Sequence, residues 1–489
     1  MSDVAVGRQD GAIRSLVPAR MDRLPWTRFH WSVVIGLGVS WILDGLEIQL
    51  VSESGFQETL GMSSAQVGFT GTIYLIGQVV GALTFGRLTD RLGRKKLFIL
   101  TLVIYLLGSG IAGLAPNMAF LWVFRFIAGL GIGGEYTAIN SAIDELIPSH
   151  YRGRVDIAVN GTYWAGAFLG ALANLYLLNP ENVAANLGWR IAFFIGPVLG
   201  LSIIYLRRHI PESPRWLVTH GRADEATQVV DDIEQRVRDE GHDLPPVDES
   251  KAMLVKPEHN IGFRTLWDVF VHRYGRRTVL GLTMMVTQSF LYNAIFFTYA
   301  LVLTNFYGIS KAQTSLYFLP FAAGNLLGPL LLGHLFDTVG RRKMIFLTYT
   351  VAGAVLFVSA LLFNAGALTA TTHTILWCVS FFFASAGASS AYLTVSEIFP
   401  LEVRGQAISY FFVIAQCSGA VAPVLYGALI GEGTSRTPLM WGYIGGALIM
   451  VVGGVVARVL GIDAERKSLE DIADPLSRAD VPAAAGGAR

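Results

Sequence analysis

Charged residues are scarce in this sequence. Only 15% of the 489 residues are Asp, Glu, Lys or Arg, whereas charged residues make up about a quarter of a typical soluble protein. Cysteine is nearly absent, and the two residues present, Cys378 and Cys417, both lie in apolar runs, which argues against a disulfide framework. The nine histidines are scattered, and the chain contains no HExxH pattern, glycine-rich phosphate loop or cysteine pair. We therefore expect no enzyme activity and no bound cofactor, metal or nucleic acid.

Long apolar runs occupy most of the chain instead. Hydrophobic residues make up 53% of it, and the mean hydropathy is +0.49. About 20 apolar residues in a helix cross a hydrocarbon core of roughly 30 Å. The sequence therefore predicts an all-α membrane protein with twelve transmembrane helices, at about 31–52, 67–86, 97–115, 119–141, 157–178, 190–206, 279–303, 314–335, 344–363, 374–395, 406–430 and 439–460.

Hydrophilic segments divide these runs into two groups of six. The opening segment has no apolar core, so we expect no cleaved signal peptide. The segment between the two groups contains "RADEATQVVDDIEQRVRDEG", a polar stretch with a helical pattern and no catalytic motif. The predicted divisions are an N-terminal segment, a first half, a linker, a second half and a tail, at 1–29, 30–206, 207–278, 279–460 and 461–489.

Cations gather in alternate connections between the predicted spans. The remaining connections contain only Lys311 and Arg436. Lys and Arg accumulate on the cytoplasmic side of membrane proteins. The pattern predicts a multi-pass protein of the plasma membrane (the inner membrane of a bacterium) with both termini in the cytoplasm. The cation-rich connections lie at 87–96, 149–154, 207–278, 336–343 and 401–404.

Two charged motifs occur twice, once in each half. "GRLTDRLGRKK" at 86–96 returns as "GHLFDTVGRRK" at 333–343, and "DELIPSHYRG" at 144–153 returns as "SEIFPLEVRG" at 396–405. Parallel six-helix halves related by an axis along the membrane normal can rock against each other around a central site. We expect the repeated charges to form a latch at the cytoplasmic surface, built from exposed ion pairs of about 0–1 kcal/mol each.

The repeated motifs resemble the signatures of the major facilitator superfamily, the first being similar to its loop between spans two and three. "PESPRWL" at 211–217 and "KSLEDI" at 467–472 resemble the sugar-porter branch. "DGLE" at 44–47 and "RFIAGLGIGGEY" at 125–136 resemble bacterial metabolite–proton and aromatic-acid–proton symporters. The resemblance implies an alternating-access carrier in which the repeated charges close a cytoplasmic gate. The expected gate residues are Asp90, Arg94, Glu145, Arg152, Asp337, Arg341, Glu397 and Arg404.

A few ionisable residues lie inside the predicted spans. A carboxylate at bilayer depth costs at least about 2.5 kcal/mol on insertion scales, so its default interpretation is functional. Asp44 and Glu47 are three residues apart and share one face of the first span, while Arg125 is the one cation well inside a span. The resemblance implies that Glu47 carries the coupled proton and that Arg125 switches it, the alternative being a fixed structural ion pair. Asp44 and Glu135 are the further candidates for proton coupling, and Glu135 is either a second titrating site or a packing residue.

Amide and aromatic residues in mid-span form the predicted solute site. Such side chains suit a small polar solute, through hydrogen bonds and ring stacking. Gln288 and Asn293 match two positions of the sugar-porter "QQxxGxN" pattern, from which Thr287 and Leu291 depart. The candidates are Asn160, Trp164, Gln288, Tyr292, Asn293, Asn325, Tyr392 and Gln416.

The prediction is therefore a monomeric secondary transporter that takes protons and a small polar organic solute such as a sugar, a polyol or an organic acid. The charge of the solute stays open. No cation inside the spans is spare for an anion unless Arg125 leaves its partner, which favours a neutral, zwitterionic or cationic solute, whereas the resemblance to aromatic-acid carriers favours an anion. An uncoupled facilitator, an organic-cation carrier and a transport-inactive nutrient sensor are the alternatives. A channel is disfavoured, because it would not need two halves that rock against each other and so would not need the repeated charged motifs.

Overall fold

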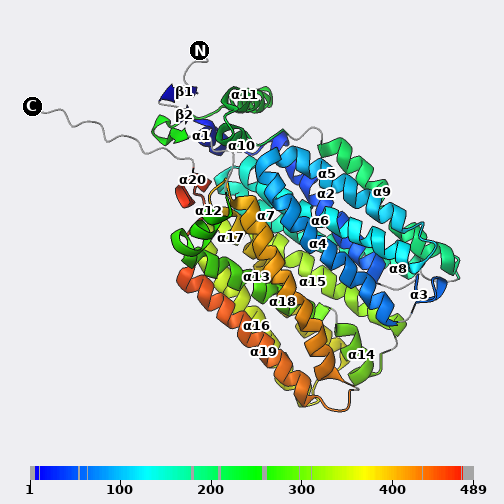
Figure 1. The fold of residues 1–489 in the computed structure, drawn as a ribbon. Helices are drawn as coiled ribbons and strands as arrows, with labels where there is room; N and C mark the ends of the chain where they lie inside the picture. Colours follow the sequence, from blue (N-terminus) through cyan, green and yellow to red (C-terminus); the bar gives the residue numbers. More distant parts are fainter. Residues whose placement is uncertain are drawn as a thin grey trace, which may run out of the picture.

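The computed structural model is almost entirely helical (Figure 1). It describes the whole chain except residues 1–5, 10–11, 53–55, 63, 178–180, 208–210, 256–261, 297, 310, 432, 475 and 477–489. Within the described residues, ten helical segments are long and apolar enough to cross a membrane. Two further segments complete the predicted set of twelve. One is α9, whose apolar part covers Asn186–Leu201, and the other consists of the consecutive helices α7 and α8.

The spans follow one another in two sets of six. Two of them are each built from a pair of consecutive helices, α7 with α8 and α13 with α14. The first set comprises α2 (Arg28–Ser52), α4 (Ser64–Leu92), α5 (Arg94–Ala112), α6 (Met118–Leu146), α7 (Ser149–Gly161) with α8 (Tyr163–Leu177), and α9 (Ala185–Arg207). The second comprises α13 (Gly275–Phe296) with α14 (Tyr299–Tyr307), α15 (Lys311–Thr338), α16 (Arg341–Asn364), α17 (Ala370–Ile398), α18 (Arg404–Ile430) and α19 (Thr437–Leu460).

The two halves repeat the same packing. In the N-terminal half α6 packs against both α4 and α5, and α2 packs against α8. The C-terminal half follows this pattern: α17 packs against both α15 and α16, and α13 packs against α18. The halves meet where α4 contacts α18 and where α7 and α8 contact α15, so at each contact the second span of one half packs against the fifth span of the other.

The helices extend further than the apolar runs predicted. Residues 87–96 and 149–154, expected as connections, are mostly helical, with α4 continuing to Leu92 and α5 beginning at Arg94. Gly93 alone separates α4 from α5, with φ at +96°, and Gly340 precedes α16 with φ at +113°. Glycine adopts such angles without steric cost, so the chain reverses within one or two residues. The repeated cations therefore lie on helix ends rather than in loops.

A small folded layer covers one end of the bundle, here called the charged end, where α4 meets α5 and α15 meets α16. Figure 1 shows β1, β2, α1, α10, α11 and α20 gathered there, with α3 (Phe56–Thr59) and α14 at the opposite end. The predicted polar helix is present as α11. The sequence did not predict the antiparallel sheet of order β1-β2-β3, because its strands are short and β3 comes from a segment far from the other two. The layer comprises β1 (Val6–Gln9), β2 (Ala12–Ser15), α1 (Val17–Asp22), α10 (Pro214–Thr219), α11 (Ala223–Asp239), a one-turn helix at Glu249–Lys251, β3 (Met253–Val255), α12 (Phe263–Trp267) with the wider turn Asp268–Arg273, and α20 (Leu469–Ile472).

Candidate functional site

Close packing of α4 against α6 positions the ionisable residues of the N-terminal half. A Cβ atom on Gly129 would lie 2.2 Å from the carbonyl oxygen of Tyr74, and one on Gly133 would lie 2.0 Å from that of Gln78. Neither position therefore tolerates a side chain. The glycines of α6 thus admit the neighbouring helix, and the contact places the Tyr74 ring against Arg125.

Glu47 and Arg125 form a buried ion pair between α2 and α6. Arg125 Nη1 donates to Glu47 Oε1 at 2.8 Å, and both side chains are at most 3% exposed. The guanidinium lies 4.1 Å from the centre of the Tyr74 ring and 5.7 Å from that of Phe193, which adds cation–π attraction. The two groups that the sequence predicted to work together are thus in direct contact.

Asp44 lies one helical turn before Glu47 and has different partners. Its Oδ2 accepts a hydrogen bond from Tyr136 at 2.7 Å, and its Oδ1 accepts one from Tyr74 at 3.3 Å. Asp44 is therefore held by hydroxyl groups, whereas Glu47 is held by a cation. Glu135, next to Tyr136 on α6, is also buried. The sequence reasoning missed both tyrosines, although Tyr136 stands in the quoted "GGEY" stretch.

An aromatic cluster surrounds Asp44 and joins the two halves. Tyr136 is stacked near Phe412 of α18, with ring centres 4.9 Å apart, and near Tyr392 of α17 at 6.3 Å. Trp41 packs edge-on to Tyr136 at 4.5 Å. Of the predicted residues, Tyr392 belongs to this cluster, and it keeps partial exposure although it lies between the halves.

The C-terminal half presents amides at mid-span. The Asn293 amide donates to the Ser289 carbonyl at 2.7 Å, and the Ser289 hydroxyl donates to Gln416 Oε1 at 3.2 Å. Gln416 in turn reaches Gln78 of the N-terminal half at 3.5 Å. Gln288 is buried, and its amide nitrogen and oxygen make no hydrogen bond with the described residues. Ser289 and Gln78 were not predicted; both are polar residues in apolar runs.

The remaining predicted solute residues fall into two places. Trp164 of α8 contacts Tyr292 across the interface, with ring centres 5.8 Å apart, and the Tyr292 hydroxyl donates to Asn325 Oδ1 at 2.8 Å. Asn160 lies nearer the charged end, where its amide donates to Asn140 Oδ1 at 3.1 Å. The structure therefore brings Trp164, Tyr292 and Asn325 together and leaves Asn160 apart from them.

Buried ion pairs connect the two halves at the charged end. Arg152 Nε donates to Glu397 Oε1 at 2.9 Å, and Arg341 binds both oxygens of the same carboxylate at 3.0 and 3.1 Å. Arg94 Nη2 lies 2.9 Å from Glu145 Oε1, and Arg404 approaches that oxygen from the other half at 3.7 Å.

Asp337 completes the set of predicted gate residues. It pairs with Arg341 and also accepts the backbone N–H of Arg154 at 2.7 Å, which adds another contact across the halves. The side chain of Asp90 lies outside the described residues.

The expectation of weak, exposed pairs at this end is wrong. The Arg94, Arg152, Arg341 and Arg404 side chains are at most 3% exposed, because the helices on which they lie pack directly against one another. Removing one partner of a buried pair leaves an uncompensated charge and typically costs about 3–5 kcal/mol.

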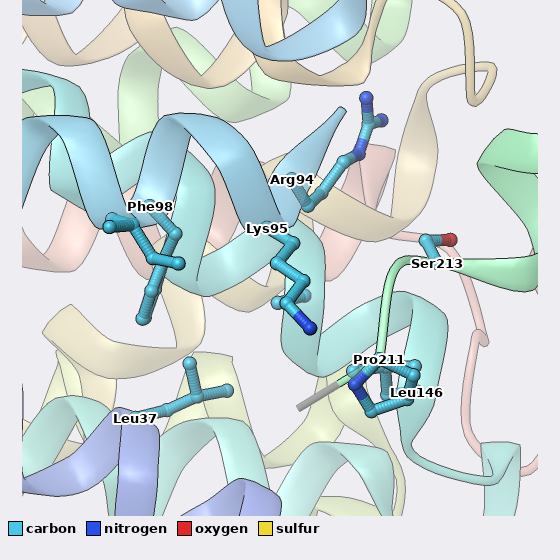
Figure 2. A pocket seen from close by; sticks show the side chains of 9 residues that line it. Leu37, Arg94, Lys95, Phe98, Leu146, Pro211 and Ser213 are labelled. Carbon is cyan, nitrogen blue, oxygen red and sulfur yellow. The ribbon is translucent and has the colours of Figure 1, made fainter. Parts of the chain in front are cut away.

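The segment before α10 supports the same end of the bundle. Glu212 accepts the backbone N–H of Arg94 at 2.9 Å and that of Lys95 at 3.3 Å, so it caps the start of α5. Burial raises the pKa of the Glu212 carboxyl. Figure 2 shows a pocket beside this turn, where Arg94 and Lys95 leave the start of α5 in different directions. No predicted solute-binding residue lines that pocket.

Comparison with known proteins identifies the family. The model of the family described as "Sugar (and other) transporter" matches residues 34–473. The niacin transporter NiaP of Acinetobacter baylyi is 27% identical over 93% of this chain and 99% of its own length. A D-xylose transporter of Levilactobacillus brevis is 24% identical over 85% of this chain and 88% of its own.

Solved structures show the same fold. The proton:xylose symporter XylE of the major facilitator superfamily, bound to 6-bromo-6-deoxy-D-glucose, superposes with a TM-score of 0.73 at 18% identity, covering 91% of this chain and 98% of that one. The partially occluded inward-open form of XylE from E. coli gives a TM-score of 0.61 at 19% identity, covering 88% and 97%. The chain therefore belongs to the sugar (and other) transporter family, and it is a multi-pass secondary transporter of a small solute with the twelve-helix major facilitator fold rather than an enzyme.

Proposed function

We propose that this transporter is a proton-coupled symporter that moves a small polar organic solute by alternating access. The observation that carries the proposal is the buried Glu47–Arg125 pair at 2.8 Å in the middle of the N-terminal half. Desolvation favours the protonated form of a carboxyl, and a nearby cation favours the ionised form. Movement of Arg125 away from Glu47 therefore makes the carboxylate take up a proton, and return of the cation releases it.

The solute is expected to bind between two chemically different faces. The N-terminal face carries Asp44 with the tyrosines that hold it, and the C-terminal face carries the amides of Gln288, Asn293 and Gln416. Amides offer both donors and acceptors to the hydroxyl or carboxyl groups of a sugar, polyol or organic acid. Because Arg125 is engaged by Glu47, binding of an anion requires that pair to separate.

Purified protein in liposomes tests the proposal directly. Sugars, polyols, aromatic acids, nicotinate-like acids and organic cations are added outside in turn, while a pH dye inside the vesicles reports proton entry. At least one of these classes should acidify the interior. Accumulation of a solute without proton movement would favour the facilitator, and transport confined to organic cations would favour the organic-cation carrier.

We also propose that the charged end faces the cytoplasm of a bacterial inner membrane and that the carrier acts as a monomer surrounded by lipid. The concentration of cations at this end supports the orientation. Gln235 is exposed on α11 within this layer. A single cysteine placed there should resist an impermeant thiol reagent added to intact cells and should react after the cells are opened. Rapid labelling of intact cells would reverse the orientation.

A further inference from the structure

Two buried carboxylates at the gate take no part in the ion pairs described above. Asp144 on α6 and Asp156 on α7 are both fully buried. None of their four carboxylate oxygens has a hydrogen-bond partner among the described residues. Ser396 lies beside Asp144, but its hydroxyl donates to the Leu393 carbonyl at 2.8 Å. In contrast, Glu397 receives donors from two arginines.

The surrounding charges do not compensate both groups. Asp156 is under the influence of Asp144 from α6, Glu397 from α17, Arg341 from α16 and Arg152 from its own helix. Among the side chains that the structure describes, the four arginines of these ion pairs face five carboxylates, namely Asp144, Glu145, Asp156, Asp337 and Glu397. One negative charge in this cluster is therefore left without a cation.

The other neighbouring cations are already engaged elsewhere. Arg215 of α10 pairs with Asp22 and Glu470. At the end of α2, which also packs on α7, the ring nitrogen Nδ1 of His30 accepts the Thr27 N–H, as a neutral imidazole does. Asp156 itself accepts no hydrogen bond from any charged donor among the described residues.

We propose that Asp156, sharing its surroundings with Asp144, binds a proton whenever the cytoplasmic gate is closed. Two carboxylates buried together without donors cannot both stay ionised, because each raises the energy of the other's charge and neither is exposed to solvent. Each acid interacts with two arginines, Asp144 with Arg404 and Arg152 and Asp156 with Arg341 and Arg152, but Asp144 also has the Ser396 hydroxyl beside it. The proton is therefore placed on Asp156. This site is distinct from Glu47, which lies at mid-membrane on another helix and is paired with Arg125.

The consequence is a gate that responds to the pH of the cytoplasm. Opening separates α7 from α15 and α17 and hydrates Asp156, which then loses its proton to the cytoplasm. Closing takes a proton up from the same side, so this site moves no proton across the membrane. Acid therefore holds the gate closed, and a carrier that brings protons into the cell slows as the cytoplasm acidifies. This step rests on the alternating access and orientation proposed above, but not on proton co-transport.

Thiol labelling of the gate tests the site without any solute. Ser409 is 1% exposed and lies across the interface from Gly86, so a cysteine there reacts only when the gate opens. The full-length protein carries Ser409→Cys and Glu47→Gln, with Cys378→Ala and Cys417→Ala removing the native thiols. The rate of reaction with N-ethylmaleimide is measured from pH 5.5 to 8.5 with and without Asp156→Asn. At each pH the rate of the parent is divided by the rate of the Asp156→Asn variant, and this ratio cancels the ionisation of the thiol itself.

The ratio should rise with pH, by up to about tenfold per unit for a single coupled proton. Asp156→Glu should keep the rise, and the acid-to-amide control Asp232→Asn, on the exposed face of α11, should behave like its parent. A ratio that stays flat across this range, with folded proteins, overturns the proposal. If Asp156→Asn does not fold, the pH dependence of the labelling rate is compared between the parent and the Asp144→Asn variant. Loss of the negative charge of Asp144 should move the pH midpoint of the increase in rate to a lower value. An unchanged midpoint would equally overturn the proposal.

Discussion

The two halves of the molecule share a fold but differ in the chemistry of their central helices. In the N-terminal half, the central side chains are ionisable: Asp44, Glu47 and Glu135 accompany Arg125. At mid-span the C-terminal half presents amides and rings instead, such as Asn293 and Tyr292. At the charged end the difference disappears, because each half contributes arginines and acids to one buried network.

This difference suggests a division of labour between the halves. Both halves need their copy of the charged gate motifs, because some charges of each half find their partners only in the other half. The central positions are free of that constraint, so one half can specialise in proton exchange and the other in recognising the solute. The predictions below test whether the two activities separate in this way.

Glu47→Gln should produce the largest effect. An amide cannot carry a proton, so uphill accumulation of solute should be lost, while exchange of solute across the membrane persists because a neutral site can still rock. The measurement compares gradient-driven uptake with counterflow in liposomes. The matched change in the other half, Asn293→Ala, should weaken solute binding and leave the coupling ratio unchanged. If Glu47→Gln concentrates solute as well as the parent does, the division between the halves fails.

Removal of a gate arginine should slow turnover in either half. Arg341→Ala frees Asp337 and one side of Glu397, whereas Arg94→Ala leaves Glu145 with Arg404 at 3.7 Å. A change of 1.4 kcal/mol in a barrier or a state equilibrium alters a rate or population about tenfold, and we expect at least that loss in kcat for Arg341→Ala. The loss for Arg94→Ala should be smaller, with KM within a few-fold for both. Poor solute binding with normal turnover would contradict the role of a gate.

The fold could be predicted from the sequence because it depends on composition and repetition. Apolar runs set the number of spans, and the doubled motifs at Asp90 and Asp337 set the two halves. The expense of charge in a membrane predicted that Arg125 pairs with an acid of the same half, and the family resemblance selected Glu47 rather than Asp44. The partners of Asp44 did not follow, because Tyr74 and Tyr136 are aromatic residues in aromatic-rich spans and nothing local distinguishes them.

The burial of the gate residues could not be predicted from the sequence either. A cation-rich turn is compatible with exposed loops or with helix ends, and only the packing of α7 against α15 and α17 decides between them. Asp156 went unnoticed for the same reason. It stands among charges in the sequence, and its lack of donors is visible only once the neighbouring helices are in place.

A moderate effect is expected at Tyr136, which contacts both the ionisable residues of the N-terminal half and the aromatic residues of the C-terminal half. Tyr136→Phe keeps the ring that packs near Phe412 and removes the hydroxyl that donates to Asp44 at 2.7 Å. A hydrogen bond to a charged group is worth about 1.5–3 kcal/mol, part of which water recovers in a partly exposed site. We expect KM for the solute to rise a few-fold with the proton-to-solute ratio unchanged, measured by paired flux. A changed ratio would place Asp44 in proton coupling alongside Glu47.

The smallest effect concerns the layer that covers the charged end and is attached to the first half through α1. Burial opposes ionisation of Glu234 on α11, but hydrogen bonds from Arg20 and Arg23 outweigh it and hold the pKa of that carboxyl below its usual value. A depressed pKa means that the folded state binds the proton less tightly than the unfolded state. The resulting stability is present above the unfolded pKa of about 4.3 and is lost as the pH falls through the lower, folded value.

Glu234→Gln should therefore lower the Tm of the purified protein by a few degrees at pH 7, with the difference from the parent shrinking as the pH falls below 4. Asp231→Asn provides the matched control, because Asp231 also pairs with Arg20 but its side chain is 54% exposed. Exposed pairs contribute about 0–1 kcal/mol, so that change should hardly move the Tm. Equal shifts for the two variants would mean that Glu234 acts as one more surface charge and that the first half gains nothing from its covering layer.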